Sequence, residues 1–380
     1  MNYVADLLIQ KNKTGHMVCG DYSVCERTPN GTYFIVCDGV GSGIYANIAA
    51  ITCAQRILEH LRLGTSLRKS CEMVASSMHR ARMEKVPFAA FSAAMIGPDN
   101  HFTVYTYEAP NPVYVQSGRA TVLVPRMYTA GYEVIGEHMG KLRLGDYLLL
   151  MSDGVTQAGM GRGYLSGIGS EGIADFITRA FRTNDDIETL MEKIIENCAE
   201  INGGKYEDDT TLAILHARVP IELTMLTGPP SDKNMDYEYA NIVSEAVGRI
   251  IVCGSTTMHI VARELNLAFE PLPNKNNPSA PPEFFIEGID LATEGAITLN
   301  QVYNVLGDEL LDLERDSSVK RMCMMLQEAD IVHMHIGNAV NDAHENLLFK
   351  QVGVRVRKTI IGLIADKLRQ MGKLVIETYH

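Results

Sequence analysis

The chain has 380 residues, 46% of them hydrophobic and 21% charged, which allows two folded domains and excludes a largely disordered protein. Acidic residues outnumber basic ones by 46 to 34, and both halves share the excess: 24 against 20 in residues 1–220, and 22 against 14 in residues 221–380. This balance argues against a nucleic-acid-binding protein, which would need a broad basic face.

The pattern of cysteines and the absence of a signal-peptide pattern both favour the cytoplasm. The eight cysteines form no Cys-x-x-Cys pair and several lie inside apolar runs, which favours reduced thiols over a disulfide scaffold or a zinc site. The N-terminus has no basic region, and no stretch has the length of a membrane span. We therefore expect a cytoplasmic protein without membrane contact.

The first part of the chain predicts strands followed by a helix pair. Strands are expected over residues 3–10 and 18–25, and the second carries Gly20-Asp21. The stretch Tyr33–Gly43 then passes from a β-rich segment through Asp38 into three glycines, which permit a tight turn and leave the Gly39 carbonyl available as an oxygen ligand. Residues 44–63 have apolar side chains at helical spacing, and Thr65 or Ser66 can cap a second helix.

The middle of the first half changes to short strand-like runs separated by turn residues, which predict an antiparallel meander. These runs cover residues 91–96, 102–108, 113–116, 120–124 and 147–151. Leu148–Met151 is apolar on both faces, so it should lie deep in a sheet, and it leads into Ser152-Asp153-Gly154. Helical spacing returns over 171–181 and 187–201, and Asp208-Asp209 precede a strand over 212–216.

Acidic side chains thus stand at strand ends or starts at four points of the chain: Asp21, Asp38, Asp153 and Asp208-Asp209. Each could be an ordinary turn aspartate on its own. If adjacent strands bring them together, their mutual repulsion requires a divalent cation, and oxygen-only ligands favour Mg²⁺ or Mn²⁺ over Zn²⁺. Two such ions bridged by one carboxylate could hold a water, lower its pKa and present it as hydroxide to a phosphorus atom.

Taken together, these motifs resemble those of a known enzyme superfamily. Its members are the metal-dependent serine/threonine protein phosphatases called PPM, and the nearest branch is the bacterial one typified by the stage II sporulation protein E. The resemblance covers residues 1–218 and rests on Gly20-Asp21, Asp38-Gly39-Val40-Gly41-Ser42-Gly43, Ser152-Asp153-Gly154-Val155 and Asp208-Asp209-Thr210-Thr211. It implies an α+β fold, a four-layer α-β-β-α sandwich of antiparallel sheets flanked by helix pairs, with metals at one end.

The resemblance also implies roles for single residues. Asp38, Asp153 and Asp208 would be the catalytic carboxylates around two Mn²⁺ or Mg²⁺ ions. Asp38 would bridge the ions, the Gly39 carbonyl would bind one, Asp153 and Asp208 would bind the other, and Asp21 would support the site directly or through water. Asp209 stands where other branches often have Asn, and it is expected to support the ligands from behind. Thr210 and Thr211 are expected to begin a strand.

The sequence departs from the wider superfamily near the first motif. Val40 stands where many members have a histidine proposed to protonate the leaving alkoxide, so another group or a water must be the acid. Arg27 is the nearby candidate for the arginine that binds phosphate in eukaryotic members. The helix pair within residues 44–85 corresponds to the one linked to switching of metal occupancy in the sporulation branch, and control by a regulator is a hypothesis.

Residues 221–380 predict a separate α/β domain. A buried strand over Arg249–Cys253 leads into Gly254, Ser255, Thr256 and Thr257 and then a helix, an arrangement that can bind an anion or can be simply a capped helix. The basic run 355–358 is interpreted as the polar approach to a helix, with anion binding as the alternative. His333 and His335 share one side of a strand, where a structural role is favoured over a metal site.

The leading prediction is therefore a manganese- or magnesium-dependent hydrolase of bacterial signalling that removes phosphate from phosphoserine or phosphothreonine of a protein partner. The second domain would regulate the first or recruit that partner. The alternatives are a phosphatase-like scaffold or sensor whose function lies in residues 221–380, and a phosphatase of small metabolites. A homodimer is left open.

Overall fold

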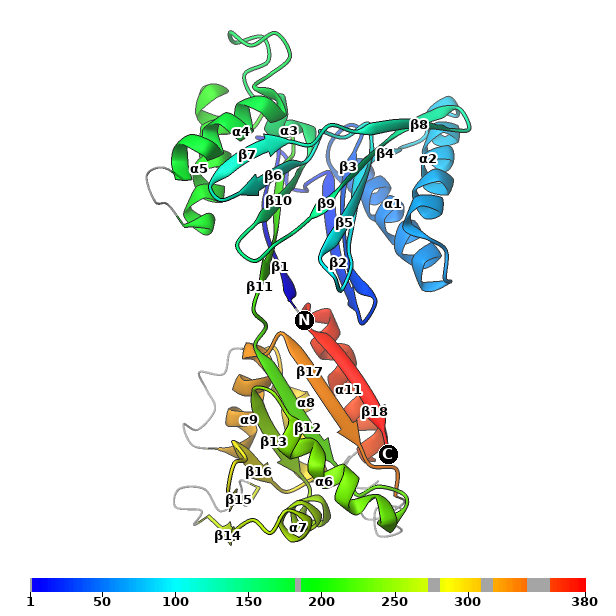
Figure 1. Cartoon of the computed structure of the whole chain (residues 1–380). Coiled ribbons are helices and arrows are strands. Elements are labelled where there is room, and N and C mark those ends of the chain that lie inside the picture. The colour runs from blue at the N-terminus through cyan, green and yellow to red at the C-terminus, as the bar shows by residue number, and fades with distance from the viewer. Residues whose placement is uncertain (1, 182–185, 273–280, 309–316, 340–355) are drawn as a thin grey trace. The chain divides into compact units, whose positions relative to one another are not determined.

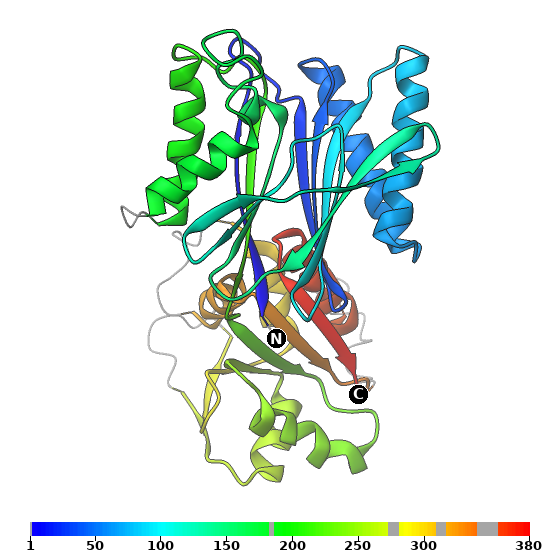
Figure 2. The ribbon, with the colours of Figure 1, turned by 45° about the horizontal axis from the view of Figure 1, so that its top comes forward.

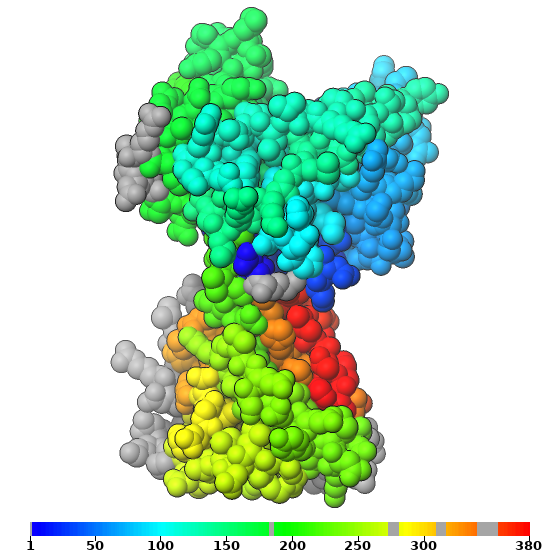
Figure 3. Space-filling view, viewed as in Figure 1, coloured from blue at the N-terminus to red at the C-terminus, as the bar shows by residue number. Residues whose placement is uncertain are grey.

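The computed structural model describes residues 2–181, 186–272, 281–308, 317–339 and 356–380 (Figure 1). The chain divides into two compact units. One comprises Met1–Glu26 and Asn30–Val219, and the other comprises Arg27–Pro29 and Pro220–His380. The space-filling view shows the surface of the chain from the same side, coloured from the N-terminus to the C-terminus (Figure 3).

The first unit is built on two sheets. One has the order β1 (Tyr3–Lys11), β11 (Thr210–Arg218), β10 (Tyr147–Met151), β6 (Val113–Gln116), β7 (Arg119–Val122). The other has the order β2 (Asp21–Thr28), β3 (Gly31–Gly39), β4 (Ala89–Ile96), β5 (His101–Tyr107), β9 (Glu133–Lys141), β8 (Arg126–Ala130). All pairs of the first sheet, and those from β3 to β8 in the second, are antiparallel.

Helix pairs cover the outer faces of the two sheets (Figure 2). The helices are α1 (Ile44–Arg62) and α2 (Leu67–Met83) on the second sheet, and α4 (Gly169–Ala180) and α5 (Ile187–Ile201) on the first, with the short α3 (Asp153–Thr156) after β10. The predicted cap of α2 is Ser66, whose Oγ accepts a hydrogen bond from the Lys69 N–H at 3.4 Å. The expected α+β sandwich of two sheets flanked by helix pairs is confirmed.

The two-residue period of a strand explains how both faces of each sheet are buried. On β3, Phe34 and Val36 belong to the core between the two sheets, whereas Ile35 and Cys37 pack against α1 and α2. The run Leu148–Met151 is at most 1% exposed, as its apolar character predicts. A strand residue two positions after Val36 must therefore face the space between the sheets.

The predicted meander is wrong in its connections. β4 and β5 lie in one sheet, whereas β6, β7 and β10 lie in the other, so consecutive strands are divided across the sandwich. Two strands were also not predicted, β8 and β9, which form a hairpin at the edge of the second sheet. Most of β8 is exposed or half-buried, which removes the apolar alternation that marks a strand.

The second unit is a mixed sheet between two layers of helices. The strand order is β14 (Phe269–Pro271), β15 (Glu283–Ile286), β16 (Leu291–Thr293), β13 (Arg249–Cys253), β12 (Glu222–Thr227), β17 (Ile331–Ile336), β18 (Leu374–Tyr379), parallel from β16 to β18. One face carries η2 (Lys233–Met235), α6 (Asp236–Glu245) and α7 (Ser255–Glu264), and the other carries α8 (Ala296–Val305), α9 (Ser318–Glu328) and α11 (Arg357–Gln370). The expected C-terminal α/β region is confirmed.

The helices of the described residues include none with the length and apolar character needed to cross a membrane.

Candidate active site

The acidic residues of the motifs meet at one end of the sandwich. Asp38 follows Val36 on β3 and so faces the space between the sheets, and Asp153 begins α3 directly after β10. The backbone N–H of Asp153 donates to Asp38 Oδ2 at 3.4 Å, and this hydrogen bond joins the Asp38 motif of one sheet to the Asp153 motif of the other. Asp21 begins β2, and Asp208 stands two residues before β11. The four motifs are thus brought together, as the sequence predicts.

Hydroxyl groups at the same end hold the carboxylates in place. Thr211 is fully buried, and its Oγ1 donates to Asp21 Oδ2 at 2.6 Å and accepts from Gln10 Nε2 at 3.1 Å. Ser152 Oγ accepts from the Thr211 N–H at 2.9 Å. The sequence predicts a strand start at Thr211 and carries no signal for the Ser152 hydrogen bond. Through these hydrogen bonds, Ser152 and Thr211 connect the Asp208-Asp209 motif to the Asp153 motif and to Asp21.

Asp209 has a different environment from its neighbour Asp208. Asp209 is 3% exposed, and its two carboxylate oxygens each accept a backbone N–H at 2.8 Å, one from Lys13 and one from Gly20. Asp208 is more exposed, and its Oδ1 lies 3.8 Å from Lys13 Nζ. Asp209 therefore anchors the segment between β1 and β2. In Asp208, Oδ1 also accepts the Asp209 N–H at 3.0 Å, which leaves Oδ2 as the oxygen available at the site.

The glycines after Asp38 and Asp153 are required by close backbone packing. A Cβ on Gly39 would lie 2.0 Å from the carbonyl oxygen of Ala46 in α1, and a Cβ on Gly154 would lie 2.1 Å from the carbonyl oxygen of Asp209. Any side chain at either position would push apart the elements that carry the carboxylates. The sequence motif Asp-Gly thus reflects packing around the site in addition to turn formation.

The part of the chain that carries these carboxylates matches a known protein family. Residues 28–218, about half of the chain, match the family described as stage II sporulation protein E, SpoIIE. The chain belongs to the SpoIIE family. Its enzyme class is accordingly that of a protein serine/threonine phosphatase in bacterial signalling. The matched span includes Asp38, Asp153 and Asp208, whereas Asp21 lies before it. No curated protein sequence matches the chain.

Several solved structures are similar to the chain at low sequence identity. The RsbU and RsbW domains of a Mycobacterium tuberculosis protein match at 17% identity and a TM-score of 0.49, over 64% of this chain and 67% of that one. The PP2C phosphatase domain of Bacillus subtilis SpoIIE, with part of its regulatory domain, matches at 16% and 0.48, over 57% of this chain and 63% of that one. The PP2C domain of SiaA from Pseudomonas aeruginosa matches at 16% and 0.44, over 56% and 84%.

The electrostatics of the SpoIIE-type site are unfavourable for the carboxylates alone. Burial raises the pKa of Asp38, and the charges of Asp21 and Asp153 raise it further. Burial also raises the pKa of Asp21 and of Asp208, with Asp153 adding to the shift in both cases. Because like charges gathered in a half-buried space disfavour ionisation, the site is suited to a cation that would compensate them.

The chemistry of the residues present fits a hard divalent cation. The Oδ1 atom of Asp21 is buried and has no hydrogen-bond partner among the described residues, so this oxygen is free to serve as a ligand. The nearby Cys19 offers a soft sulfur, which a hard cation such as Mg²⁺ does not favour as a ligand. Within the described ranges, no three His, Cys, Asp or Glu side chains are grouped so that they could hold a metal ion. The donor chemistry at this end, carboxylate and carbonyl oxygens, is the kind that Mg²⁺ and Mn²⁺ prefer.

Two residues near the first motif have positions that limit their roles. Val40 is 49% exposed and carries no proton to donate, so it cannot replace the histidine of other PPM enzymes. Arg27 is on β2 six residues after Asp21, a separation of about 20 Å along a strand. The prediction that Arg27 binds phosphate at the acidic end is therefore wrong.

The candidate residues of the second unit lie in two places. His333 Nε2 is 3.1 Å from Glu222 Oε2, and His335 Nδ1 is 3.0 Å from His380 Nε2, which gives each histidine a protein partner and favours the structural role. Residues 254–257 line a pocket at the carboxyl ends of the parallel strands. Of the basic run, Arg355 lies outside the described residues, whereas Arg357 lines that same pocket.

Proposed function

We propose that the chain hydrolyses phosphoserine or phosphothreonine on a protein partner in a reaction that depends on two divalent cations, Mn²⁺ or Mg²⁺. The observation that carries this proposal is the meeting of the Asp38, Asp153 and Asp208 motifs at one end of the sandwich, with the N–H of Asp153 bonded to Asp38. The buried and unpartnered Oδ1 of Asp21 supports it.

The ion-holding residues are Asp38, the Gly39 carbonyl, Asp153, Asp208 and Asp21. Bound divalent ions would supply charge neutralisation and Lewis acidity at this end of the sandwich. The protein contributes orientation: Gln157 Nε2 donates to Asp153 Oδ2 at 2.7 Å, and Thr211 orients Asp21 by the hydrogen bond described above. Asp209 holds in place the segment that precedes Asp21, because its two carboxylate oxygens accept the backbone N–H groups of Lys13 and Gly20.

The second unit, Pro220–His380, would regulate this activity or recruit the phosphoprotein. It is a compact unit, with its own mixed sheet and a core on each face of that sheet. We further propose the domain limits 1–218 and 221–380 and a cytoplasmic location.

The test is hydrolysis of an aryl phosphate and of a phosphoserine protein by the purified chain, with and without Mn²⁺. Turnover that requires the ion and disappears in Asp38→Asn and in Asp153→Asn is expected. Asp99→Asn, the same change in the exposed turn between β4 and β5, should leave turnover unchanged. If no turnover occurs and calorimetry detects no Mn²⁺ binding, the phosphatase-like scaffold is the correct alternative. Faster turnover of small phosphate esters than of phosphoproteins would identify a metabolite phosphatase.

A further inference from the structure

The second unit has a pocket where the order of its parallel strands reverses. From the central strand β12, the chain adds β13 and β16 on one side, and later β17 and β18 on the other. In open α/β sheets the crevice at such a point, outside the carboxyl ends of the strands, is where ligands bind. Here that crevice is a cavity of about 270 Å³ lined by the residues that follow β12, β13, β16 and β17 and by the first residue of α11.

One wall of the pocket carries an unneutralised positive charge. Arg357 Nη2 donates to the carbonyl oxygens of Gly337 at 3.2 Å and Ala339 at 3.0 Å, while its Nε is buried without a partner. Among the described residues Arg357 forms no ion pair, and burial lowers its pKa. Gly228 makes room for the guanidinium, since a Cβ there would lie 2.4 Å from Arg357 Cζ.

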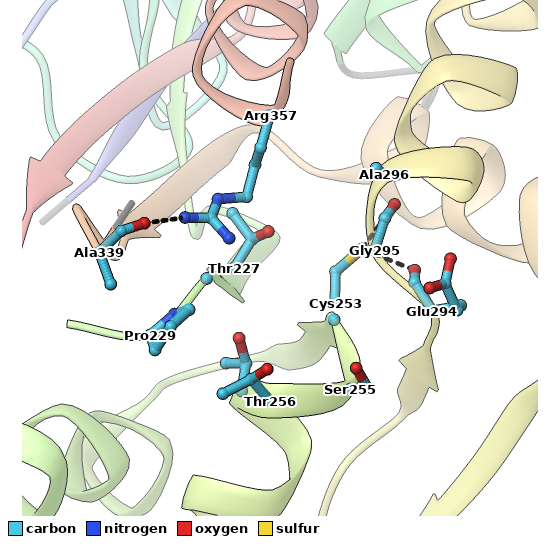
Figure 4. Close-up of a pocket in the computed structure, with 13 residues that line it drawn as sticks. Thr227, Pro229, Cys253, Ser255, Thr256, Glu294, Gly295, Ala296, Ala339 and Arg357 are labelled. Carbon is cyan, nitrogen blue, oxygen red and sulfur yellow. Dashed lines mark hydrogen bonds between the residues drawn. The ribbon is translucent and has the colours of Figure 1, made fainter. Parts of the chain in front are cut away.

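The opposite wall is the N-terminus of α7, a helix of ten residues. Its N-cap is Gly254, which has φ 116° and no side chain to accept the N–H groups of the first turn. Those N–H groups and the helix dipole favour an anion. Figure 4 shows Ser255 and Thr256 at this helix start, with Arg357 and Thr227 across the pocket and Glu294 on the side away from Arg357.

Two buried hydroxyl groups give independent evidence of a ligand. Thr227 and Thr257 both line the pocket and are both 0% exposed, yet in the part of the chain that the structure describes neither Oγ1 has a hydrogen-bond partner. A buried hydroxyl without a partner costs free energy, and most buried polar groups avoid this. Two such hydroxyls in one pocket, beside an unpaired guanidinium nitrogen, are donors that a bound anion would satisfy.

We propose that this pocket binds the phosphate group of a small phosphorylated metabolite. Donors approach from three directions, namely the Arg357 guanidinium, the first turn of α7 and the Thr227 and Thr257 hydroxyls, which suits a tetrahedral oxyanion better than a planar carboxylate. The cavity is several times larger than a single water, about 30 Å³, so it holds more than the phosphate itself. Glu294 also lines the pocket, so a hydroxyl or amino group in the rest of the ligand would find a carboxylate there.

The test measures binding to the full chain in the presence of EDTA, with inorganic phosphate and ribose 5-phosphate as probes. Chelation keeps the acidic end of the first unit without cations, so that phosphate is repelled there. One binding event per chain by calorimetry, tighter for ribose 5-phosphate than for inorganic phosphate, is expected. Binding of inorganic phosphate alone would overturn the assignment of a metabolite, and equal binding of acetate would overturn the preference for phosphate.

Three variants locate the site. Arg357→Gln should weaken binding about tenfold or more, because a charge-assisted contact is lost. Thr257→Val has the same shape without the hydroxyl, so it should weaken binding several-fold while the melting temperature of the ligand-free chain does not fall. Asp38→Asn should bind like the wild type, because the pocket does not depend on phosphatase chemistry. Unchanged binding in Arg357→Gln and Thr257→Val, or lost binding in Asp38→Asn, would refute the proposal.

Discussion

Replacing Asp209 by Asn should cost stability and separate this residue from its neighbour Asp208. The Asp209 carboxylate is 3% exposed and accepts the N–H groups of Lys13 and Gly20, each at 2.8 Å. An asparagine keeps one acceptor oxygen and turns an NH₂ group toward the other N–H. Loss of one hydrogen bond to a charged acceptor costs about 1.5–3 kcal/mol. For a unit of this size that corresponds to a melting temperature lower by about 3–12 °C.

The matched control is Asp208→Asn, which makes the same change one residue earlier. The Asp208 side chain is 39% exposed, so its replacement should change the free energy of unfolding of the metal-free chain by less than about 1 kcal/mol. Its affinity for Mn²⁺ should fall by about tenfold or more. Calorimetric melting in EDTA and Mn²⁺ titration measure the two quantities. A stable Asp209→Asn, or an Asp208→Asn that binds Mn²⁺ normally, would contradict the division of roles described here.

Two other perturbations probe the packing of the site and the charge state of the second unit. Gly154→Ala should destabilise the first unit by about 1–3 kcal/mol and abolish aryl phosphate hydrolysis, because its Cβ would lie 2.1 Å from the Asp209 carbonyl oxygen. Gly362→Ala, in α11 with no atom within 4 Å of its Cβ position, should instead stabilise the chain by about 0.5–1 kcal/mol in urea unfolding. Burial and the neighbouring His380 lower the pKa of His335 from 6.5 to about 4. The unfolded chain therefore binds a proton that the folded chain does not, and the second unit should lose stability between pH 6.5 and 4, with a smaller loss in His335→Gln.

The sequence predicted those elements whose signals are local. Leu148–Met151 could be placed in a buried strand because four apolar residues in a row bury both faces, and the following Asp153 then had to stand at a strand end. The division of strands between two sheets has no such signal. Neighbouring runs such as β5 and β6 differ in sheet only because the sandwich closes around a core contributed by distant segments.

The same distinction holds for the functional residues. The carboxylates could be named because they stand in short motifs at strand ends, with a glycine directly after Asp38 and Asp153. Ser152 and Thr211 instead act through one hydroxyl each, at positions set by strand pairing. In the second unit, Gly254 and Arg357 were noticed separately as features of helix starts. They are about a hundred residues apart in the chain, and only the parallel sheet places them around one pocket.

The position of β11 determines when the phosphatase unit can form during synthesis. β11 lies between β1 and β10 and pairs with both. Its pairing partner β1 is therefore synthesised about two hundred residues earlier. Asp208 and Asp209 arrive with that same strand. A nascent chain in which β10 has been synthesised but β11 has not has an open sheet edge and lacks Asp208 and Asp209. The closing of the sheet and the completion of the acidic cluster therefore become possible in one late step.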